Sequence, residues 1–193
     1  AGEPPAAASS QSGRPSIVVL PFQNMSGDPE QEYFADGMVE DIITALSRFK
    51  SLFVIARNSS FAYKGRSPDI RQVGKELGVR YVLEGSVRKA GGRVRITAQL
   101  VHGASNDSVW AERYDRDLND IFALQDEISE AIVKALKLKL LPEEKKAIEQ
   151  RGTTNLQAYN LYLMARQHYT NGLLIDTRKL DAVARLCRSA IEL

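Results

Sequence analysis

The chain contains very few of the residues that build metal sites and covalent cross-links. Its 193 residues include one cysteine, Cys187, and two histidines, His102 and His168. A single cysteine excludes an intramolecular disulfide, and two distant histidines without paired cysteines do not match the ligand spacing of a zinc site. The sequence therefore predicts neither a metal nor a cofactor. Cys187 lies in an apolar helical pattern, and we interpret it as a small packing residue.

Long apolar runs are missing as well. No stretch approaches the ~18 consecutive apolar residues of a membrane-spanning helix. The opening segment, AGEPPAAASSQSGRPS, has no apolar stretch after a basic start, which is typical of a linker and not of a signal peptide. We expect a cytoplasmic protein, or a periplasmic one if a membrane span precedes this segment. A chain that begins on a linker is expected to be a piece of a longer protein.

Motifs for the common catalytic chemistries are absent too. The sequence has no G-x-x-x-x-G-K-[ST] phosphate-binding loop and no G-x-S-x-G nucleophile elbow. Asp36, Glu40 and Asp41 are close together in the sequence, but we interpret them as a solvated acidic face and not as a catalytic carboxylate cluster. The sequence therefore predicts that this segment is not an enzyme.

The charge balance gives little support for nucleic-acid binding. There are 26 Lys and Arg residues against 24 Asp and Glu, for a formal net charge of +2. Basic residues do concentrate between Arg48 and Arg95. This half could contact nucleic acid or anionic lipid. Alternatively, Arg88, Arg93 and Arg95 line the wet face of a hairpin and pair with acids of the first helix. We favour the second interpretation.

The N-terminal third has the pattern of a strand, a helix and a second strand. The continuous apolar runs Ser16–Phe22 and Leu52–Ala56 have strand length, and a run without alternation indicates a strand covered on both faces. Between them, from about Glu30 to Phe49, apolar residues recur at three- and four-residue spacing, which indicates an amphipathic helix. This order predicts a parallel, right-handed crossover.

Two local features of this helix are informative. Asp28 before Pro29 is typical of a helix N-cap followed by a proline in the first turn. Gly37 lies in the middle of the helix, where glycine costs roughly 1 kcal/mol relative to alanine. We therefore expect another part of the chain to approach the backbone closely at Gly37.

The middle of the chain changes to period-two alternation. A short helix is predicted from Asp69 to Leu77, and three alternating segments follow it at Arg80–Lys89, Arg93–Val101 and Val109–Tyr114. Tight turns between alternating segments are typical of an antiparallel meander with one wet face. We therefore predict an α/β (α+β) domain with a mixed sheet of about five strands and helices against its apolar face.

The C-terminal third is helical. Leu118–Leu141 is predicted to be a long helix, and Pro142–Gln150 a shorter charged one. Gly152 then marks a boundary, which divides the chain into a linker at 1–15, the α/β domain at 16–151 and a helical segment at 152–193.

The helical segment resembles the start of a tetratricopeptide repeat array. Its two helical patterns cover Leu156–Tyr169 and Thr177–Leu193. The resemblance rests on Leu161, Met164, Ala165 and His168 in the first helix and on Ala190-Ile191-Glu192-Leu193 at the end of the second. A single repeat cannot bury its own apolar face, so we expect a truncated array with further repeats in the parent chain.

The best candidate for a binding site is the segment between the second strand and the next helix. This segment, Arg57–Gly65, has no clear period and follows the end of a predicted parallel strand, where open α/β sheets place their ligand crevices. Alternatively, its small polar residues cap the loop and its aromatic residues cover the core, and the sequence leaves both interpretations open. The candidate binding residues are Arg57, Asn58, Ser59, Ser60, Tyr63 and Lys64.

Four long stretches together resemble the TolB amino-terminal-like domain. They are VLPFQNMSGDPEQEYFADGMVEDIITALSRF, FVIARNSSFAYKG, ELGVRYVLEGSVRKAGGRVRITAQL and WAERYDRDLNDIFALQDEI, within Ser16–Leu141. The chain departs from the family pattern in the turn before Trp110, so any role of that turn does not carry over. The resemblance implies a mixed-sheet domain without catalytic residues of its own. Such domains accompany tetratricopeptide arrays in bacterial class III adenylate/guanylate cyclases, whose metal-binding aspartates lie on a separate upstream domain.

These observations predict a non-catalytic regulatory or protein-interaction module of a larger bacterial signalling protein. Its expected partner is another protein or its own output domain, a nucleotide cyclase by the resemblance. One alternative is a small-molecule sensor that uses the crevice near residues 57–64. Another is an accessory module of a transcription regulator, because related modules are joined to winged-helix regulators.

Overall fold

The protein folds around a six-stranded mixed sheet with the strand order β3-β1-β4-β5-β6, in which β2 also pairs with β4. The computed structural model describes residues 13–138, 141–148, 152–170 and 177–193. The strands are β1 (Ser16–Val19), β2 (Gln23–Asn24), β3 (Phe53–Val54), β4 (Tyr81–Ala90), β5 (Arg93–His102) and β6 (Ser108–Asp117). The helices are α1 (Glu32–Ser47), α2 (Arg57–Phe61), α3 (Ile70–Leu77), α4 (Ile121–Ala135), α5 (Pro142–Ile148), α6 (Leu156–Thr170) and α7 (Thr177–Ile191), with 3-10 turns at Pro29–Gln31 and Leu118–Asp120.

The parallel part of the sheet confirms the predicted crossover. Strand β1 pairs in parallel with β3 on one side and with β4 on the other. Pro21 interrupts β1, and the chain then resumes as β2, a short parallel partner of β4 that the sequence pattern did not reveal. Asp28 caps the following turn, since its Oδ1 accepts a hydrogen bond from the Glu30 backbone N–H at 2.8 Å. The predicted cap is therefore confirmed.

The antiparallel part is the predicted meander. Strands β4 and β5 pair over ten residues each, and β5 pairs with β6. The β4–β5 turn uses Gly91 and Gly92 at φ +56° and +79°, a region that favours glycine. Strand β6 is longer than predicted and extends to Asp117.

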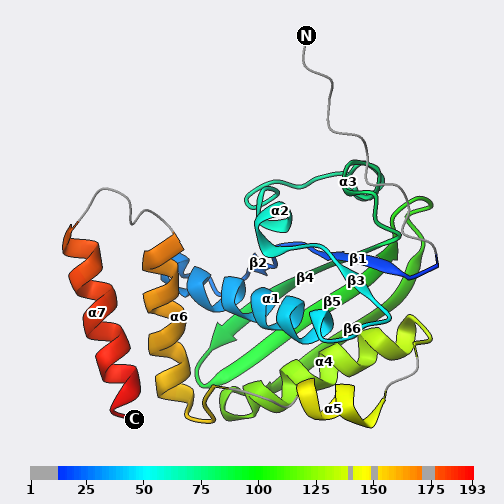
Figure 1. Cartoon of the computed structure of the whole chain (residues 1–193). Helices are drawn as coiled ribbons and strands as arrows, with labels where there is room; N and C mark the ends of the chain where they lie inside the picture. The colour runs from blue at the N-terminus through cyan, green and yellow to red at the C-terminus, as the bar shows by residue number, and fades with distance from the viewer. Residues whose placement is uncertain (1–12, 139–140, 149–151, 171–176) are drawn as a thin grey trace.

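Both faces of the sheet are covered at β1. Figure 1 shows α1 and α4 lying across one face, and they build the larger apolar core with side chains such as Val19 and Leu83. The neighbouring residues Val18 and Val82 point to the other face and pack with Val73 of α3 in a second cluster. This arrangement explains why the Ser16–Phe22 run is apolar without alternation.

Three predictions about the helices are corrected by the structure. Arg57–Phe61 forms the short helix α2 and is not an irregular loop. Helix α4 ends at Ala135, well before Leu141, and Lys137 just beyond it has a positive φ of 54°. Cys187 is exposed on α7 and does not pack in a core. The predicted end of the charged helix at Gln150 lies outside the described residues.

Helices α6 and α7 form an antiparallel pair next to α1, as Figure 1 shows at the left. Helix α6 contacts α1 directly and also meets α4, where the rings of Tyr159 and Phe122 lie edge-on, so the helical segment packs on both helices. Among the described helices, none combines the length and the apolar composition that crossing a membrane requires.

Candidate functional site

The two cations of the predicted site face helix α1. Arg57 forms an ion pair with Glu40, and its guanidinium also lies 4.0 Å from the centroid of the Phe61 ring. Lys64 pairs with Asp36 and, at 3.2 Å, with Glu32. These contacts anchor the segment to α1, so the side chains of Arg57 and Lys64 have a structural role.

Two further residues of the predicted site also have internal partners. Ser60 is fully buried and its hydroxyl donates to the carbonyl oxygen of Val19 in β1. The Tyr63 hydroxyl donates to Glu76 of α3 at 2.5 Å, and burial together with this carboxylate raises the pKa of Tyr63 to about 12. Four of the six predicted residues therefore hold the segment in place. The alternative interpretation anticipated a structural role for Ser60 and Tyr63 but not for Arg57 and Lys64.

The other two residues, Asn58 and Ser59, lie on the exposed side of α2. Their side chains make no hydrogen bond with any other described residue. The six residues lie on one segment, but their polar groups do not point toward one shared binding position.

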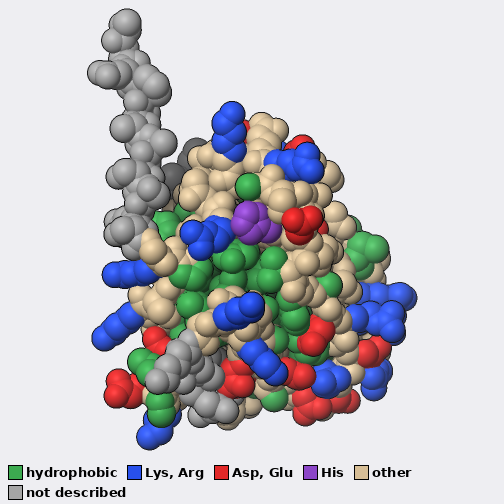
Figure 2. All heavy atoms as spheres, turned by 90° about the vertical axis from the view of Figure 1, so that its right-hand side faces the viewer, with side chains coloured by type: hydrophobic (Ala, Val, Ile, Leu, Met, Phe, Trp, Pro, Cys, Tyr) green, Lys and Arg blue, Asp and Glu red, His purple; other side chains and the backbone are tan. Residues whose placement is uncertain are grey.

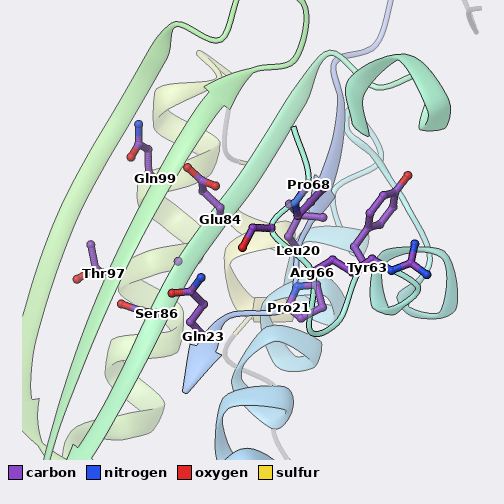
Figure 3. Close-up of a pocket in the computed structure, with 12 residues that line it drawn as sticks. Leu20, Pro21, Gln23, Tyr63, Arg66, Pro68, Glu84, Ser86, Thr97 and Gln99 are labelled. Atoms are coloured by element: carbon purple, nitrogen blue, oxygen red, sulfur yellow. The ribbon is translucent and has the colours of Figure 1, made fainter. Parts of the chain in front are cut away.

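A cavity of about 310 Å³ does lie beside this segment, as Figure 3 shows. Of the six predicted residues, Tyr63 lines it, and the opposite wall comes from the open face of β4 and β5. Sequence reasoning missed that wall, which side chains from two strands of the predicted meander form together. Lys64 and Tyr63 line a neighbouring cavity of about 530 Å³. The polar residues of the first wall are Glu84, Ser86, Thr97 and Gln99.

A second polar cluster joins α1, α4 and α6. Gln125 Nε2 donates to Asp41 Oδ2 at 2.7 Å and to the Tyr159 hydroxyl oxygen at 2.9 Å, and the Tyr159 hydroxyl donates to the same Asp41 oxygen. Burial raises the pKa of Asp41 despite the hydrogen bonds from Tyr159 and Gln125, which act in the opposite direction. Burial and the nearby Asp41 also raise the pKa of Tyr159 well above its usual value, so this phenol stays a donor.

The acids of α1 belong to this interface and to the α2 segment, and they are not a solvated face. Glu32, Asp36 and Glu40 are spaced four residues apart, so they form one stripe along the helix. Lys64 pairs with the first two, and Arg57 of α2 and Arg166 of α6 both pair with the third. The interpretation of Asp36, Glu40 and Asp41 as a solvated face was therefore wrong.

The close approach predicted at Gly37 is confirmed, and the approaching group is Leu163 of α6. A Cβ atom on Gly37 would lie 2.5 Å from Leu163 Cδ2, which is closer than real Cβ contacts allow. Leu163 itself is buried. The missing side chain of Gly37 is therefore what lets α6 lie directly on α1.

The basic residues of the hairpin find their partner on β6 and not on the first helix. Arg93 and Arg95 contact the two carboxylate oxygens of Asp115 at 2.5 and 2.6 Å. These hydrogen bonds, first from Arg95 and then from Arg93, lower the pKa of Asp115 to about 2. The predicted exposed position of Arg93 and Arg95 on the hairpin is confirmed. Their predicted partners on the first helix are wrong, because both pair with Asp115.

One end of the sheet presents apolar side chains. The pairing of β3, β1, β4 and β5 places Phe53, Tyr81 and His102 at this end. The rings of Tyr81 and His102 meet edge-on, with their centroids 5.6 Å apart. Phe53 is 47% exposed. Figure 2, which views the side at the right of Figure 1, shows hydrophobic side chains gathered around a histidine with Lys and Arg side chains about them.

Comparison with known proteins identifies the family. Residues 12–131 match the family model described as "HilA/YgeH-like transcriptional regulator, second domain". The chain belongs to this family. The HilA/YgeH-like match covers nearly the same residues as the resemblance to the TolB amino-terminal-like domain.

A relative of this HilA/YgeH-like domain is a Rhizobium meliloti (strain 1021) protein named "Putative adenylate cyclase 3". It is 62% identical over 154 residues, which are 80% of this chain and 26% of the relative. The chain therefore spans about a quarter of the length of that relative.

Solved structures with a similar fold include TolB from Acinetobacter baumannii, at a TM-score of 0.49 and 19% identity, over 64% of this chain and 28% of that one. Lipoprotein GNA1162 from Neisseria meningitidis matches at a TM-score of 0.45 and 20% identity, over 65% of this chain and 99% of that one. Likenesses at this level say nothing about what the HilA/YgeH-like domain does.

Replacing Ser60 tests whether the predicted site is structural. We expect Ser60→Ala to lower the free energy of unfolding by about 1–3 kcal/mol, because it leaves the buried Val19 carbonyl without its donor. Ser59→Ala in the same helix, where the side chain is exposed, should change it by no more than about 0.5 kcal/mol. Chemical denaturation measures both values, and equal effects of the two variants would rule out the structural role.

The raised pKa of Asp41 predicts a pH dependence of stability. Because the folded pKa lies above the ordinary value of 3.8, Asp41 contributes stability that is fully present below that value and is lost as the pH rises through the folded pKa. We expect the free energy of unfolding of the wild type, minus that of Asp41→Asn, to fall over this window. Asp36, whose pKa is raised too, titrates in both proteins and cancels in the difference. A difference that is flat or rises with pH would contradict the burial of Asp41.

Proposed function

We propose that this chain is a non-catalytic regulatory module of a larger bacterial signalling protein, in which α6 and α7 begin a tetratricopeptide array. The module couples a protein partner, bound by the helical array, to an output domain. The Rhizobium relative supports a nucleotide cyclase as that output domain, because its name is that of a cyclase and it is similar over most of this chain. Its similarity to the chain covers only about a quarter of its own length, which leaves ample room for a separate catalytic domain.

The observation that carries this proposal is the direct contact between α6 and α1. Leu163 lies on Gly37, Arg166 pairs with Glu40, and Tyr159 donates to Asp41. An interface that combines close apolar contact with ion pairs and hydrogen bonds is costly to open, because separation exposes apolar surface to water and breaks these polar contacts. Any displacement of α6 is therefore passed to α1, and through the apolar face of α1 to the sheet.

The exposure of α7 supports a continuing array. Leu180 is 47% exposed, Ile191 83% and Leu193 52%. Large apolar side chains on one helix of an antiparallel pair are what a repeat shows when its neighbour is not present. In the parent protein the next repeat would cover these side chains.

The family description also fits a regulatory role, since it names the second domain of transcriptional regulators. Attachment to a transcription regulator is the alternative to a cyclase. The sensor alternative at residues 57–64 receives less support, because both cations and the hydroxyls of Ser60 and Tyr63 are bonded within the domain, which leaves only Asn58 and Ser59. We propose a cytoplasmic location, where a nucleotide substrate of the output domain is available.

The non-catalytic role has a direct test. We expect the isolated chain, incubated with ATP or GTP and either Mg²⁺ or Mn²⁺, to form no cyclic nucleotide above a protein-free blank. The reason is that, by the resemblance, the metal-binding aspartates of such cyclases lie on a separate domain. Chromatographic detection of the product measures this, and turnover that scales with protein concentration would overturn the proposal.

The coupling through Gly37 is tested by placing a side chain there. Gly37→Leu should push Leu163 away and lower the free energy of unfolding by about 1–3 kcal/mol, as overpacking typically does. Amide hydrogen exchange should become faster across residues 156–170 while β4 and β5 keep their protection.

Two further variants make this test specific. Leu163→Ala in the Gly37→Leu background should restore part of the lost protection, because it removes the clash. Ser47→Leu, at an exposed position of the same helix, should leave exchange in α6 as it is in the wild type. If Gly37→Leu leaves α6 as protected as before, the two units are not coupled here.

A further inference from the structure

A cavity of about 500 Å³ lies between the sheet domain and the helical pair. Residues of α1, α4, α6 and α7 line it, so it exists only while α6 is docked on α1. Its volume falls within the range of about 300–1,000 Å³ that is usual for small-molecule sites. It is separate from the crevice beside Tyr63 in Figure 3, with which it shares no lining residue.

The walls of this cavity are rich in aromatic rings. Phe122 of α4 and Tyr159 of α6 meet edge-on, with ring centroids 5.1 Å apart, and both are buried. Tyr162 lines the cavity as well and is 48% exposed, which places it toward the mouth together with Ile191. An apolar or aromatic ligand body can therefore be enclosed on several sides.

The polar end of the cavity is a carboxylate with one oxygen already bonded. Asp41 Oδ2 accepts from both Tyr159 and Gln125. Within the described residues, no donor reaches the other oxygen, Oδ1, and Asp41 is not among the side chains with a fully enclosed unsatisfied atom. Gln125 and Tyr159 thus fix the carboxylate in place while its second oxygen stays available to a ligand.

This combination selects the charge of the ligand. Aromatic rings present their negative faces to cations, and a carboxylate both attracts an ammonium group and accepts its hydrogen bonds. Arg48 and Asp126 also line the cavity, and their opposite charges offset each other, so the net charge of the lining groups is that of the Asp41 carboxylate, which would repel an anion. A bare metal ion is not the ligand of choice, since the described residues contain no group of three His, Cys, Asp or Glu side chains that could hold one.

We propose that this cavity is a binding site for an organic ammonium compound with an apolar body. The ammonium group donates to Asp41 Oδ1, and the body lies against Phe122, Tyr159 and Tyr162. Because the ligand contacts elements of both units, it favours the docked position of α6. The inference goes beyond the proposed function: the chain can be a non-catalytic module without this site, and the site can exist on a chain with another role.

Three indole probes that differ in charge test the site on the full chain. Tryptamine carries an ammonium group, 3-ethylindole is neutral, and indole-3-propionate carries a carboxylate. In titrations followed by calorimetry and by chemical-shift changes, tryptamine should bind saturably, the neutral probe more weakly, and the acid not measurably. Asp41→Asn should weaken tryptamine binding by about tenfold, equivalent to about 1.4 kcal/mol. Asp36→Asn, on the same helix but outside the cavity, should change it by less than about twofold.

A second variant keeps the test decisive if Asp41→Asn disturbs the fold. Thr44 is an exposed residue of α1 that lines the cavity, so Thr44→Trp can occupy the cavity while leaving the core intact. Circular dichroism confirms folding, and tryptamine binding should then be lost. The proposal is overturned if tryptamine does not saturate the wild type, if the acid binds as tightly as the amine, or if neither Asp41→Asn nor Thr44→Trp weakens binding.

Discussion

Helix α1 packs against the sheet on one side and against α6 on the other, and the rest of the structure depends on these two contacts. Its apolar face, with Met38 and Ile42, is buried against the sheet and α4. Its other side receives α6 at Gly37, where the absence of a Cβ atom lets Leu163 lie on the backbone. Leu163 would have to move to admit a side chain at this single position. Gly37 lowers the stability of helix α1 by roughly 1 kcal/mol relative to alanine, and the close packing of Leu163 accompanies this loss.

The charges of α1 follow the same constraint. Favourable interaction with the helix dipole requires acids only in the first turn, yet the acidic stripe continues through Asp36 to Glu40. The partners of the stripe explain its length, because Lys64, Arg57 and Arg166 reach it from two different segments of the chain. Charges that looked like a solvated face fix both the α2 segment and α6 against one helix. For this reason Arg57 and Lys64, which were proposed as ligand-binding residues, turn out to be anchors.

Features of the fold could be predicted from the sequence when residues close together in the chain determine them. The crossover, the Asp28 cap, the Gly91-Gly92 turn and the meander were predicted, because each depends on periodicity or on turn chemistry within a few residues. Helix α2 was missed, since five residues are too few to show a helical period and its Ser60 bonds to a carbonyl 41 positions away.

The candidate site was predicted only in part for the same reason. Tyr63 does line a cavity, but the polar wall opposite it comes from β4 and β5. The Asp41 cluster needs a partner 118 positions along the chain, and no local pattern indicates such a contact. Gly37 was the one local signal of that interface, because a glycine in the middle of a helix indicates that another segment of the chain packs closely against it.

The central claim is that α1 and α6 form one energetic unit, and a double-mutant cycle on Asp41 and Tyr159 measures it most directly. The free energy of unfolding is determined for the wild type, for Asp41→Ala, for Tyr159→Phe and for the double variant. The hydrogen bond between the two side chains predicts an interaction energy of about 0.5–3 kcal/mol. Losses that add within about 0.3 kcal/mol would show that the two residues do not interact, and would contradict the docking of α6 on α1.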